Sequence, residues 1–509
     1  MKQKIAIIDI GSNTLRLVIY ENAKSGKRFK EIENMKKATR IRNFLNDEQE
    51  LNEEGIHFLL NTLRDFQTII NLYEVKETIC VATATIRQAK NKHEILKIVL
   101  ERTGLALNIL GEYEEAYYGY LAVINSIDLV EGITIDMGGG STEITHFNNR
   151  ELIHHVSLPF GALSLKIQFV KGDIPTEQEL VQIRQYIRSQ LQKISWIENI
   201  QIPIIAMGGS ARNVAQLHQN FIHYPLAGIH HYEMSISNIH DIKESLKSLT
   251  FKGLQNAEGL SRDRADTILL AIEVFEILSD YSSASRFILS EKGLREGVLY
   301  SKWNQREREF TTLVDSEIHE LIEEYHIDVP KSKQLVKIAL MFFNSLKEVH
   351  GIGIEFSTSD LELLKRGARV YHLGNYLNEE SGPLTFSLLA NRPIGFSHKE
   401  RVKLALIASY KGRGTFRQFL DPFKGWLTKD ERKKLCLLGA ILKLSQSLNK
   451  SERNIVNEIK IQPNDDSWFI DLYCLNDYGP EKYQFEKQKK HLEKLLKITL
   501  IPHFHLVNR

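Results

Sequence analysis

Short runs of aliphatic and β-branched residues alternate with longer helix-periodic stretches through residues 1–305. Two of the short runs, residues 5–8 and 133–135, each end at an acid, Asp9 and Asp136 respectively. β-branched residues favour strands, and strands that alternate with helices predict an α/β fold. The other segments that fit this alternation are strands at residues 78–82, 108–110, 151–156 and 202–207, helices at 52–73, from 112, from 176 and from 259, and a strand, turn and helix at 286–299.

The pattern changes after residue 303 to long apolar stretches with helical period and few strand signals. Near the end, residues 455–461 and 468–475 predict a hairpin, followed by a helix at 486–496 and a strand at 497–501. At roughly 150 residues per domain, a chain of 509 residues holds about three domains. The predicted regions are a first lobe at residues 1–125, a second lobe at 126–305, a mainly helical domain at 306–450 and a small α/β unit at 451–509.

Each strand that ends at an acid continues through a glycine turn into a second apolar strand. The first turn reads DIGSNTLRL from Asp9, and the second reads DMGGGSTEI from Asp136, 127 residues later. An offset of this length indicates a domain-scale duplication, because solenoid repeats have much shorter periods. We therefore expect two similar α/β lobes that face each other across a cleft, with both turns at one shared ligand.

The second turn has the chemistry of a phosphate site. Backbone N–H groups without intervening side chains can converge on a small anion. The turn offers this at three consecutive glycines, Gly138, Gly139 and Gly140. Ser141 and Thr142 add hydroxyl groups. Asp136 and Glu143 flank the turn with carboxylates that suit a hard cation such as Mg²⁺. A bare glycine turn between two strands is the alternative, and the flanking acids and hydroxyls favour the functional interpretation.

An acidic segment, GEYEEA, opens the helix predicted from residue 112 and lies between the two turns. Acids also favour helix N-termini through the helix dipole, so Glu112, Glu114 and Glu115 have a purely structural explanation. Because the lobes must connect here, a carboxylate of this segment can alternatively accept a proton from a water that attacks phosphorus. The residues alone leave both interpretations open.

Arginines near the turns are candidates for phosphate binding. Arg87 follows the small-residue strand end ATATIR, and Arg16 follows the first turn. For Arg87 a solvated side chain is an equal alternative, and Arg16 is the weaker candidate. A third glycine turn at residues 208–210 fits an ordinary strand-to-helix turn. Ion pairing with nearby acids is the commoner outcome for three later arginines, Arg262, Arg264 and Arg295.

The net charge is only +2, but the basic residues are unevenly placed. Residues 401–450 hold twelve Lys or Arg against three acids, an excess of +9 that can attract a polyanion through its field. Solvated helix faces are the usual alternative. Because aromatic residues are sparse in this basic block, a phosphate chain is a better partner for it than a nucleic acid.

The sequence also argues against several classes of protein. It contains no P-loop, HExxH or GxSxG motif, which disfavours P-loop NTPases, zincins and α/β-hydrolases. The three cysteines, Cys80, Cys436 and Cys474, are odd in number and far apart, which fits a reducing cytoplasm. Asp9 interrupts the first apolar run, so we expect neither a signal peptide nor a membrane span.

Seven segments occur in order along residues 1–305: DIGSNTLRL, ATATIRQA, GEYEEA, DMGGGSTE, GGSARN, GLSRDRADTIL and EKGLREGVL. Together they resemble the exopolyphosphatase and guanosine pentaphosphate phosphohydrolase (Ppx/GppA) family of the actin and sugar-kinase superfamily. The resemblance implies two actin-like, ribonuclease H-like lobes around a cleft. It also implies hydrolysis of the terminal phosphoanhydride of inorganic polyphosphate, with release of orthophosphate and with Mg²⁺ or another divalent cation.

The resemblance assigns roles by position. Glu114 matches the family's general base. The implied metal-binding residues are Asp9, Asp136 and Glu143. The implied phosphate-binding residues are Ser12, Asn13, Thr14, Arg87, Gly138, Gly139, Gly140 and Ser141. We also expect a cytoplasmic homodimer, with no membrane or nucleic-acid partner.

The C-terminal half departs from the family pattern. Many members carry a helical HD-like domain with a His-Asp pair, whereas RVYHLGN places Tyr371 and His372 at those positions. The expected earlier histidine is missing near Ser332, and the later acid is missing where Gln446 and Asn449 stand. Without these ligands a two-metal site cannot form. We expect this half to be a binding and dimerising scaffold that supplies a basic track for polyphosphate.

Three rival functions stay open. A guanosine pentaphosphate hydrolase shares every active-site motif of the polyphosphate hydrolase. An ATP-dependent sugar or acid kinase is compatible with the third glycine turn, although the glutamate-rich segment fits hydrolysis better. A phosphate or nucleotide sensor without turnover ranks last, because both acids and a candidate base are present.

Overall fold

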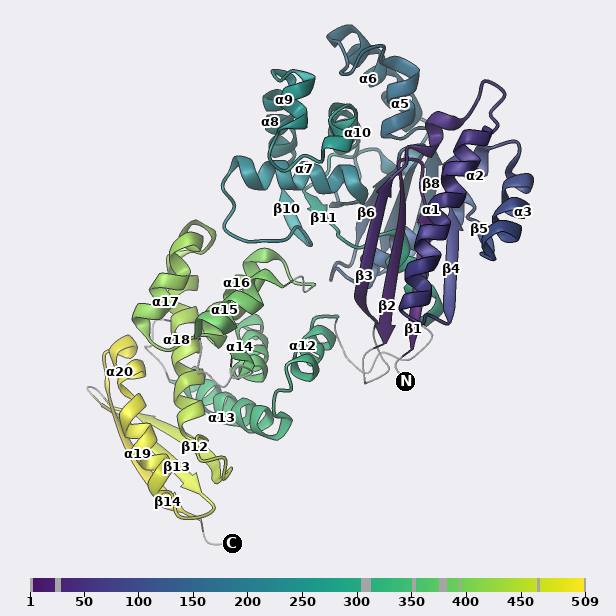
Figure 1. Ribbon diagram of the computed structural model, residues 1–509. Coiled ribbons are helices and arrows are strands. Elements are labelled where there is room, and N and C mark those ends of the chain that lie inside the picture. The colour runs from purple at the N-terminus through teal and green to yellow at the C-terminus, as the bar shows by residue number, and fades with distance from the viewer. Residues whose placement is uncertain are drawn as a thin grey trace. The chain divides into compact units, whose positions relative to one another are not determined.

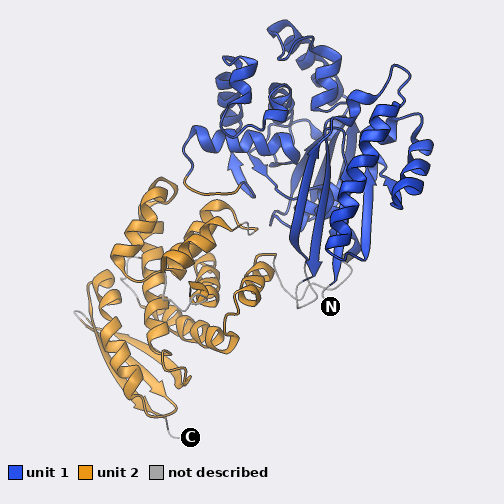
Figure 2. Cartoon of the chain, in the orientation of Figure 1, with its two compact units in different colours: residues 1–224, 229–307 blue, residues 225–228, 308–509 orange. Residues whose placement is uncertain are grey.

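The structure, a computed structural model, describes residues 3–22, 29–303, 313–349, 354–374, 382–392, 395–464 and 467–507. The chain forms two compact units (Figure 2). Unit 1 comprises residues 1–224 and 229–307, and unit 2 comprises residues 225–228 and 308–509. The residue boundaries expected within each unit stay predictions.

Unit 1 contains two sheets, and the N-terminal residues build the first (Figure 1). Its elements are β1 (Lys4–Ile10), β2 (Thr14–Asn22), β3 (Phe29–Ala38), β4 (Glu77–Ala82) and β5 (Leu107–Ile109), with η1 (Ile41–Phe44), α1 (Glu53–Leu72), α2 (Ala84–Gln88) and α3 (Lys92–Thr103). The strand order is β3-β2-β1-β4-β5. β1 pairs antiparallel with β2 and parallel with β4, so Asp9 lies opposite Arg16. Leu17, Leu63 and Val99 are fully buried in the core that these elements share.

The second sheet repeats the arrangement of the first. Its strands are β6 (Gly132–Met137), β7 (Thr142–Asn148), β8 (Glu151–Leu158), β9 (Ile204–Met207), β10 (Tyr232–Met234) and β11 (Phe287–Leu289). The helices are α5 (Ala162–Phe169), α6 (Glu177–Leu191), η2 (Ser195–Ile197), α7 (Gly208–Phe221), α8 (Ile236–Lys247), α9 (Phe251–Gln255), η3 (Arg262–Arg264) and α10 (Ile268–Ser282). The strand order is β10-β11-β9-β6-β7-β8. The strands that correspond in position to β1, β2, β3, β4 and β5 of the first sheet are β6, β7, β8, β9 and β11, respectively. The pairing directions also agree, which confirms the predicted duplication of an α/β lobe.

Two helices connect the lobes, α4 (Glu112–Ile124) and α11 (Leu294–Trp303). α4 packs on the second sheet, whereas α11 packs Val298 and Leu299 on the first. The helices cross where a Cβ on Gly297 would lie 1.9 Å from the Tyr118 carbonyl oxygen, so only glycine fits. This crossing brings the acidic start of α4 and Arg295 of α11 to the strand ends of both lobes.

Unit 2 is mainly helical and ends in a small sheet. Its helices are α12 (Leu313–Glu324), α13 (Val329–Glu348), α14 (Thr358–Val370), α15 (Gly382–Asn391), α16 (His398–Ala408), α17 (Arg413–Leu420), η5 (Asp421–Trp426) and α18 (Lys429–Ser447). The terminal elements are β12 (Val456–Pro463), β13 (Ser467–Cys474), α19 (Gly479–Gln488), α20 (Lys490–Leu496) and β14 (Thr499–Leu506), with strand order β12-β13-β14. None of the described helices has the length and apolarity needed to cross a membrane.

Two predicted helices differ from the structure. The segment from Gly259 begins as a loop with the short η3 turn, and α10 starts only at Ile268. Gly259 has a φ of +90°, and the Ser261 N–H donates to the Asn213 side chain on α7, so this stretch follows α7 instead of winding into a helix. α10 is buried on nearly all sides rather than amphipathic. The helix predicted near the C-terminus is divided at Lys489 into α19 and α20.

Candidate active site

The two glycine turns of unit 1 lie against each other. A Cβ on Gly139 would lie 3.0 Å from the Ser12 Cβ and 3.4 Å from the Asn13 backbone nitrogen. A Cβ on Gly140 would lie 2.8 Å from Ser12 Oγ. The missing side chains therefore let the first turn approach the second. The structure brings the predicted phosphate-binding residues of both turns together.

Both turns are closed by the same backbone hydrogen bond. The Gly11 N–H donates to the Thr14 carbonyl and the Gly138 N–H donates to the Ser141 carbonyl, each at 3.0 Å. The hydroxyl of Thr142 is used elsewhere, because its Oγ1 donates to the Phe160 carbonyl at 2.7 Å. Ser141 and Thr142 were both expected to offer a hydroxyl group at the second turn. The hydroxyl of Thr142 instead forms a structural hydrogen bond.

Four carboxylates lie near the turns: Asp9 on β1, Glu115 on α4, Asp136 on β6 and Glu143 on β7. We call these four residues the acid group. Burial and the charge of Asp9 raise the pKa of Asp136 to about 6, although nearby arginines oppose the shift. Burial and the charge of Glu115 raise the pKa of Glu143 well above its usual range. Burial also raises the pKa of Asp9. Carboxylates that repel one another in this way favour a proton or a cation between them.

The structure separates the two candidate bases of α4. Glu114 is exposed, and its Oε2 accepts the Gly111 N–H at 2.8 Å as part of the helix cap. Glu115 is only 11% exposed. Burial raises the pKa of Glu115 to about 7; the Arg87 guanidinium opposes this shift, and Asp136 adds to it. The carboxylate that joins the acid group is therefore Glu115, and Glu114, the predicted base, lies outside it.

Arg87 is bound to the acidic segment rather than to solvent. Its Nη1 donates to Glu115 Oε2 at 2.6 Å and to the Leu110 carbonyl at 2.9 Å. The side chain is 16% exposed, so the alternative of a solvated arginine is wrong. Arg87 orients Glu115, and its remaining N–H groups are the ones left for a phosphate.

Two further arginines, Arg295 and Arg264, lie near the acid group and act on the Asp136 carboxylate. Arg295 Nη1 donates to Asp9 Oδ2 at 2.9 Å, which confirms the ion pair expected for this residue. Arg264 lies against the third glycine turn, where a Cβ on Gly209 would lie 2.1 Å from Arg264 Nη2. Arg264 Nη1 donates to Ser210 Oγ at 3.1 Å. The third turn is the predicted strand-to-helix turn between β9 and α7, and an arginine covers it.

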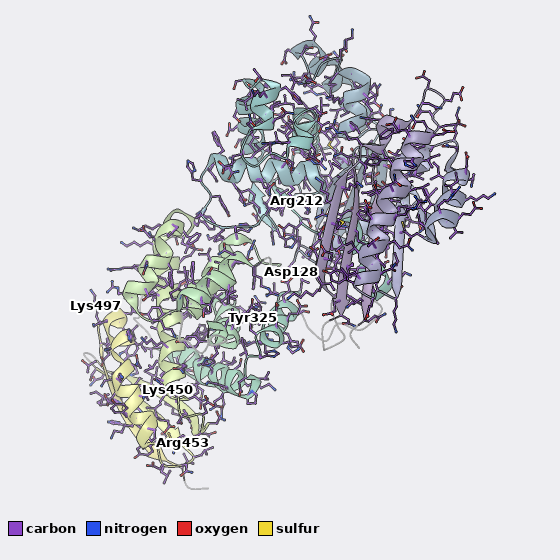
Figure 3. All side chains as sticks on the ribbon, in the orientation of Figure 1. Asp128, Arg212, Tyr325, Lys450, Arg453 and Lys497 are labelled. Atoms are coloured by element: carbon purple, nitrogen blue, oxygen red, sulfur yellow. The ribbon has the colours of Figure 1, made fainter. Side chains whose placement is uncertain are left out.

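Additional positive charge comes from Arg16 on β2 and from Arg212 on α7; Arg212 is labelled in Figure 3. Both act on the carboxylates, since Arg16 lowers the pKa of Asp9 and Arg212 lowers that of Asp136, each against the larger effect of burial. Burial and the neighbouring arginines lower the pKa of Arg16 to about 10. The motifs signalled Arg16 only weakly, and Arg212 stands within GGSARN without a role assigned to it.

The acid group suits a magnesium ion that also binds substrate. Among the residues that the structure describes, no three His, Cys, Asp or Glu side chains meet as a ready-made metal site. Mg²⁺ usually takes one or two carboxylates from the protein and completes its octahedron with waters and phosphate oxygens. Asp136 and Asp9, whose charges repel each other, are the donors that a cation would relieve. The donor set therefore fits Mg²⁺ shared with a phosphate.

The sequence profile of the Ppx/GppA phosphatase family matches residues 18–306, more than half of the chain. The chain belongs to the Ppx/GppA phosphatase family. This confirms the predicted family and the predicted enzyme class, a hydrolase of the phosphatase type.

Curated relatives of this Ppx/GppA member are distant. The bifunctional 3-dehydroquinate synthase/phosphatase of Fusobacterium nucleatum is 27% identical over 299 residues, which cover 56% of this chain but only 44% of that protein. Exopolyphosphatase 1 of Mycobacterium tuberculosis is 24% identical over 319 residues, 62% of this chain and 92% of the relative. The guanosine-5'-triphosphate,3'-diphosphate pyrophosphatase of Pseudoalteromonas atlantica is 24% identical over 360 residues, 67% of each chain.

Solved structures confirm the predicted fold for the Ppx/GppA region. The Aquifex aeolicus member of the family matches with a TM-score of 0.53 and 28% identity, covering 60% of this chain and 100% of that one. An exopolyphosphatase from Cytophaga hutchinsonii matches with a TM-score of 0.54 and 22% identity, covering 60% of this chain and 99% of that one. The profile match ends at residue 306, before the main part of unit 2 begins at residue 308.

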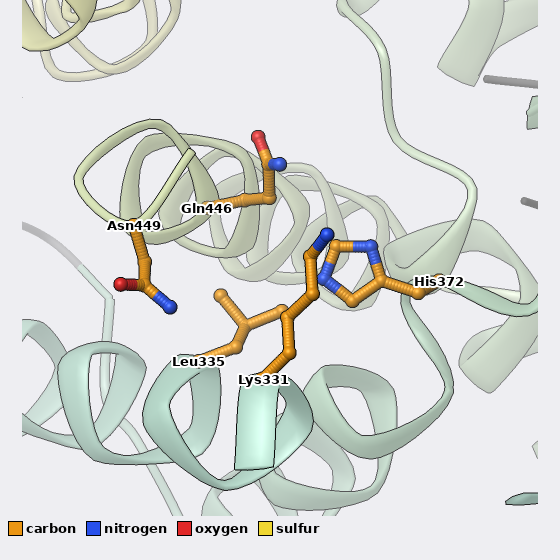
Figure 4. Close-up of a pocket in the computed structure, with 5 residues that line it drawn as sticks. All are labelled: Lys331, Leu335, His372, Gln446 and Asn449. Carbon is orange, nitrogen blue, oxygen red and sulfur yellow. The ribbon is translucent and has the colours of Figure 1, made fainter. Parts of the chain in front are cut away.

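Three of the positions at which unit 2 was expected to lack metal ligands, His372, Gln446 and Asn449, line a small pocket (Figure 4). Its lining comprises Lys331, Leu335, His372, Gln446 and Asn449. Figure 4 shows the Lys331 ammonium beside the His372 ring, with the two amides on the facing side. Lys331 also forms an ion pair with Glu452. With one imidazole and no carboxylate in the lining among the described residues, the pocket offers no donor set for two metal ions.

The basic block at residues 401–450 is neutralised over much of its length. Lys403 pairs with Glu431 at 2.7 Å, and Lys434 pairs with Asp360 at 2.8 Å. Four exposed basic side chains of the block have no acidic partner among the described residues: Arg413, Arg417, Lys429 and Lys450. Fewer basic side chains could therefore bind a polyanion here than the net charge of the block indicates.

Proposed function

We propose that unit 1 hydrolyses the terminal phosphoanhydride of inorganic polyphosphate and releases orthophosphate. The observation that carries the proposal is the contact between two glycine turns beside a group of buried carboxylates. Turn N–H groups favour a phosphate, and acids favour its metal ion and its attacking water. Relatives that carry the name exopolyphosphatase support the same substrate.

The terminal phosphate would lie between the turns, with donors from Ser12, Asn13 and the run Gly138, Gly139, Gly140 and Ser141. The nearby arginines would offset the charge of the chain. Phosphoryl transfer passes through a loose transition state with charge on the equatorial oxygens, so fixed donors at these oxygens lower the barrier. Thr14 would contribute by holding the first turn in shape, since its backbone carbonyl accepts the Gly11 N–H that closes the turn.

We assign the general base to Glu115 in place of Glu114. Glu115 lies with the acid group and is oriented by Arg87, whereas Glu114 caps its own helix. The Glu115 carboxylate would accept a proton from water while the water oxygen bonds to the terminal phosphorus. The bond from phosphorus to the bridging oxygen breaks, and the shortened chain leaves. A pKa of about 7 leaves a substantial ionised fraction near neutral pH.

Asp136, Asp9 and Glu143 are the residues that would hold Mg²⁺ together with the phosphate. When bound, the ion supplies positive charge at the phosphate oxygens. We expect chelation to abolish phosphate release and added Mg²⁺ to restore it. Phosphate release that persists undiminished in excess chelator would contradict the role given to these acids.

A phosphate-release assay on the full chain tests the substrate. It compares polyphosphates of graded length, guanosine pentaphosphate, and ATP with a sugar acceptor. We expect orthophosphate from polyphosphate. No release from any polyphosphate length would refute the proposal, and ATP-dependent transfer to the sugar would identify a kinase instead.

Guanosine pentaphosphate is the second candidate substrate. The relative named for that nucleotide matches 67% of the chain, somewhat more than the 62% matched by the mycobacterial exopolyphosphatase. Arg264 at the third turn disfavours a nucleoside there, because its guanidinium lies against Gly209. The ratio of phosphate released from the two substrates decides between them.

We also propose that the protein forms a homodimer and lies in the cytoplasm. Light scattering of the purified full chain measures the first, and fractionation of cells measures the second. A monomer at all concentrations would remove dimerisation from the role proposed for unit 2.

A further inference from the structure

Arg42 is a charged residue at the active site that belongs neither to the motifs nor to the acid group. It lies in η1, where its backbone N–H donates to the Ser12 carbonyl at 3.4 Å. Its guanidinium reaches the other lobe, because a Cβ on Gly140 would lie 2.7 Å from Arg42 Nη1. The same Cβ would lie 2.8 Å from Ser12 Oγ. Arg42 Nη1 and Ser12 Oγ therefore flank one glycine at the contact between the two turns.

The hydrogen bond that the Arg42 side chain makes is to a neutral group. Its Nη1 donates to Gln88 Oε1 at 2.9 Å, and no carboxylate pairs with it among the described residues. Burial lowers the pKa of Arg42, and no acid offsets that effect. A partly buried cation without a counter-charge is unfavourable until an anion completes its surroundings.

Neighbouring arginines of unit 1 are different. Arg87 pairs with Glu115 and Arg295 pairs with Asp9. Even Arg40, two residues before Arg42, donates to both carboxylate oxygens of Asp266 at 2.8 and 2.9 Å. These three arginines are paired with carboxylates of the protein, whereas Arg42 is a guanidinium beside the turns whose charge an incoming anion can neutralise.

We propose that Arg42 binds a phosphate group at the contact between the two glycine turns, and that Gln88 positions it there. The ligand is inorganic phosphate or the terminal phosphate of a phosphoanhydride chain. A guanidinium can present two parallel N–H bonds to phosphate oxygens, and the bond to Gln88 uses only part of its donor set. The inference rests on the proposed function for the chain that carries the phosphate.

Orthophosphate is the probe for this site, because the proposed product cannot be hydrolysed further. Its dissociation constant is measured by calorimetry on the full chain with Mg²⁺, for the parent, Arg42→Ala and Arg42→Lys. The loss of charge-assisted hydrogen bonds should weaken binding by about tenfold to a hundredfold in Arg42→Ala. Arg42→Lys should recover part of the loss. The matched control is Arg102→Ala, an exposed arginine on α3 of the same lobe, which should bind like the parent.

Two variants at Gln88 test its positioning role. In Gln88→Glu, a carboxylate would pair with Arg42 and compete with phosphate. We therefore expect weaker orthophosphate binding, and a polyphosphate KM that rises more than kcat falls. Gln88→Leu only releases the guanidinium, so it should shift KM in the same direction by a smaller factor. Gln88 is exposed, which makes these changes compatible with folding.

Parent-like orthophosphate binding in a folded Arg42→Ala protein would overturn the proposal, as would no measurable binding by the parent. If Arg42→Ala does not fold, Arg42→Lys and Gln88→Glu carry the test, and parent-like binding in both would also overturn it. Failure of the proposed function has another signature: no polyphosphate would release phosphate, while orthophosphate binding would still depend on Arg42.

Discussion

The candidate active site of unit 1 and the pocket of unit 2 differ in how their charged side chains are paired. In unit 1, buried carboxylates act on one another and raise their pKa values, and Arg42 has no acidic partner among the described residues. In the unit 2 pocket, the Lys331 ammonium is paired with Glu452, and two of the other lining groups are neutral amides. We therefore expect a charged ligand where the fold leaves charge uncompensated, in unit 1, and a structural role for the pocket of unit 2, where the charge is paired.

Among the changes that test this comparison of the two regions, the largest effect is predicted at the second glycine turn. A Cβ on Gly161 would lie 2.5 Å from the Gly138 carbonyl oxygen and 2.6 Å from the Gly139 carbonyl carbon. Because these are backbone atoms, Gly161→Ala must displace the turn. We expect phosphate release to fall by about a hundredfold, and the free energy of unfolding to fall by about 1–3 kcal/mol. Kinetics and denaturant unfolding measure the two effects.

The control for this change is Gly425→Ala in unit 2, where a Cβ meets no atom within 4 Å. It should leave phosphate release unchanged. Parent-like turnover in Gly161→Ala would show that the position of the second turn does not affect the chemistry. This result would contradict the functional role given to the turns of unit 1.

The raised pKa values of the buried acids predict a pH dependence of stability in the absence of Mg²⁺. The pKa of Asp136 is about 6 against an ordinary 3.8, and that of Glu115 is about 7 against 4.5. Between about pH 4 and 7 the folded state therefore binds more protons than the unfolded state. Protonation stabilises the native protein below this window, and the free energy of unfolding falls as the pH rises through it.

Thermal unfolding in chelator, from about pH 5 to pH 8, measures this decline. Asp136→Asn should decline less steeply, which separates the acid group from other titrating residues. Mg²⁺ should raise the unfolding midpoint most at the upper end of the range. A parent midpoint that rises with pH across the window would show that burial and mutual repulsion do not raise the pKa values of these acids.

A smaller effect is predicted for the exposed basic residues of unit 2. Arg413→Glu combined with Arg417→Glu reverses two charges on α17 that the structure leaves without acidic partners among the described residues. We expect the KM for long polyphosphate to rise by about threefold to tenfold, and that for short chains to rise less, because a long chain extends further into the field. Lys433→Glu, whose side chain pairs with Asp430, is the control. Equal losses for both lengths would exclude a track on this helix.

The smallest effect is predicted for the pocket of unit 2. The Lys331 and Glu452 side chains are 24% and 55% exposed, so their ion pair should contribute no more than about 1 kcal/mol to the free energy of unfolding. Lys331→Met should lower it by at most that amount and leave phosphate release unchanged. A loss of turnover as large as that of Gly161→Ala would place this pocket within the functional machinery.

The fold, and the contact between the two glycine turns at the candidate site, could be predicted from the sequence because their signals are local. Strands that end at Asp9 and Asp136, each followed by a glycine turn, are contiguous in the chain and recur in both lobes. β3 gave no such signal, since KEIENMKK within it is mostly polar and the strand is largely accessible. Its place follows from pairing with β2.

The residues of the segment alone could not separate Glu114 from Glu115 as the candidate base, because neighbouring residues on a helix differ by about 100° in direction. The EYEEA segment has acids on several faces, and only the packing of α4 shows that Glu115 points to the acid group. Arg42 was missed for a related reason, since its contact with Gly140 joins residues that are far apart in the chain. No local pattern marks such a pair.

The account depends most on the assignment of Glu115, which Glu114→Gln and Glu115→Gln test side by side in the phosphate-release assay. Glutamine at position 115 keeps an acceptor for Arg87 but cannot take a proton from water. We predict that Glu115→Gln lowers kcat by about 10²- to 10⁴-fold with little change in KM. Glu114→Gln should stay close to the parent, because its carboxylate only caps the helix. A large loss in Glu114→Gln with parent-like turnover in Glu115→Gln would contradict the account.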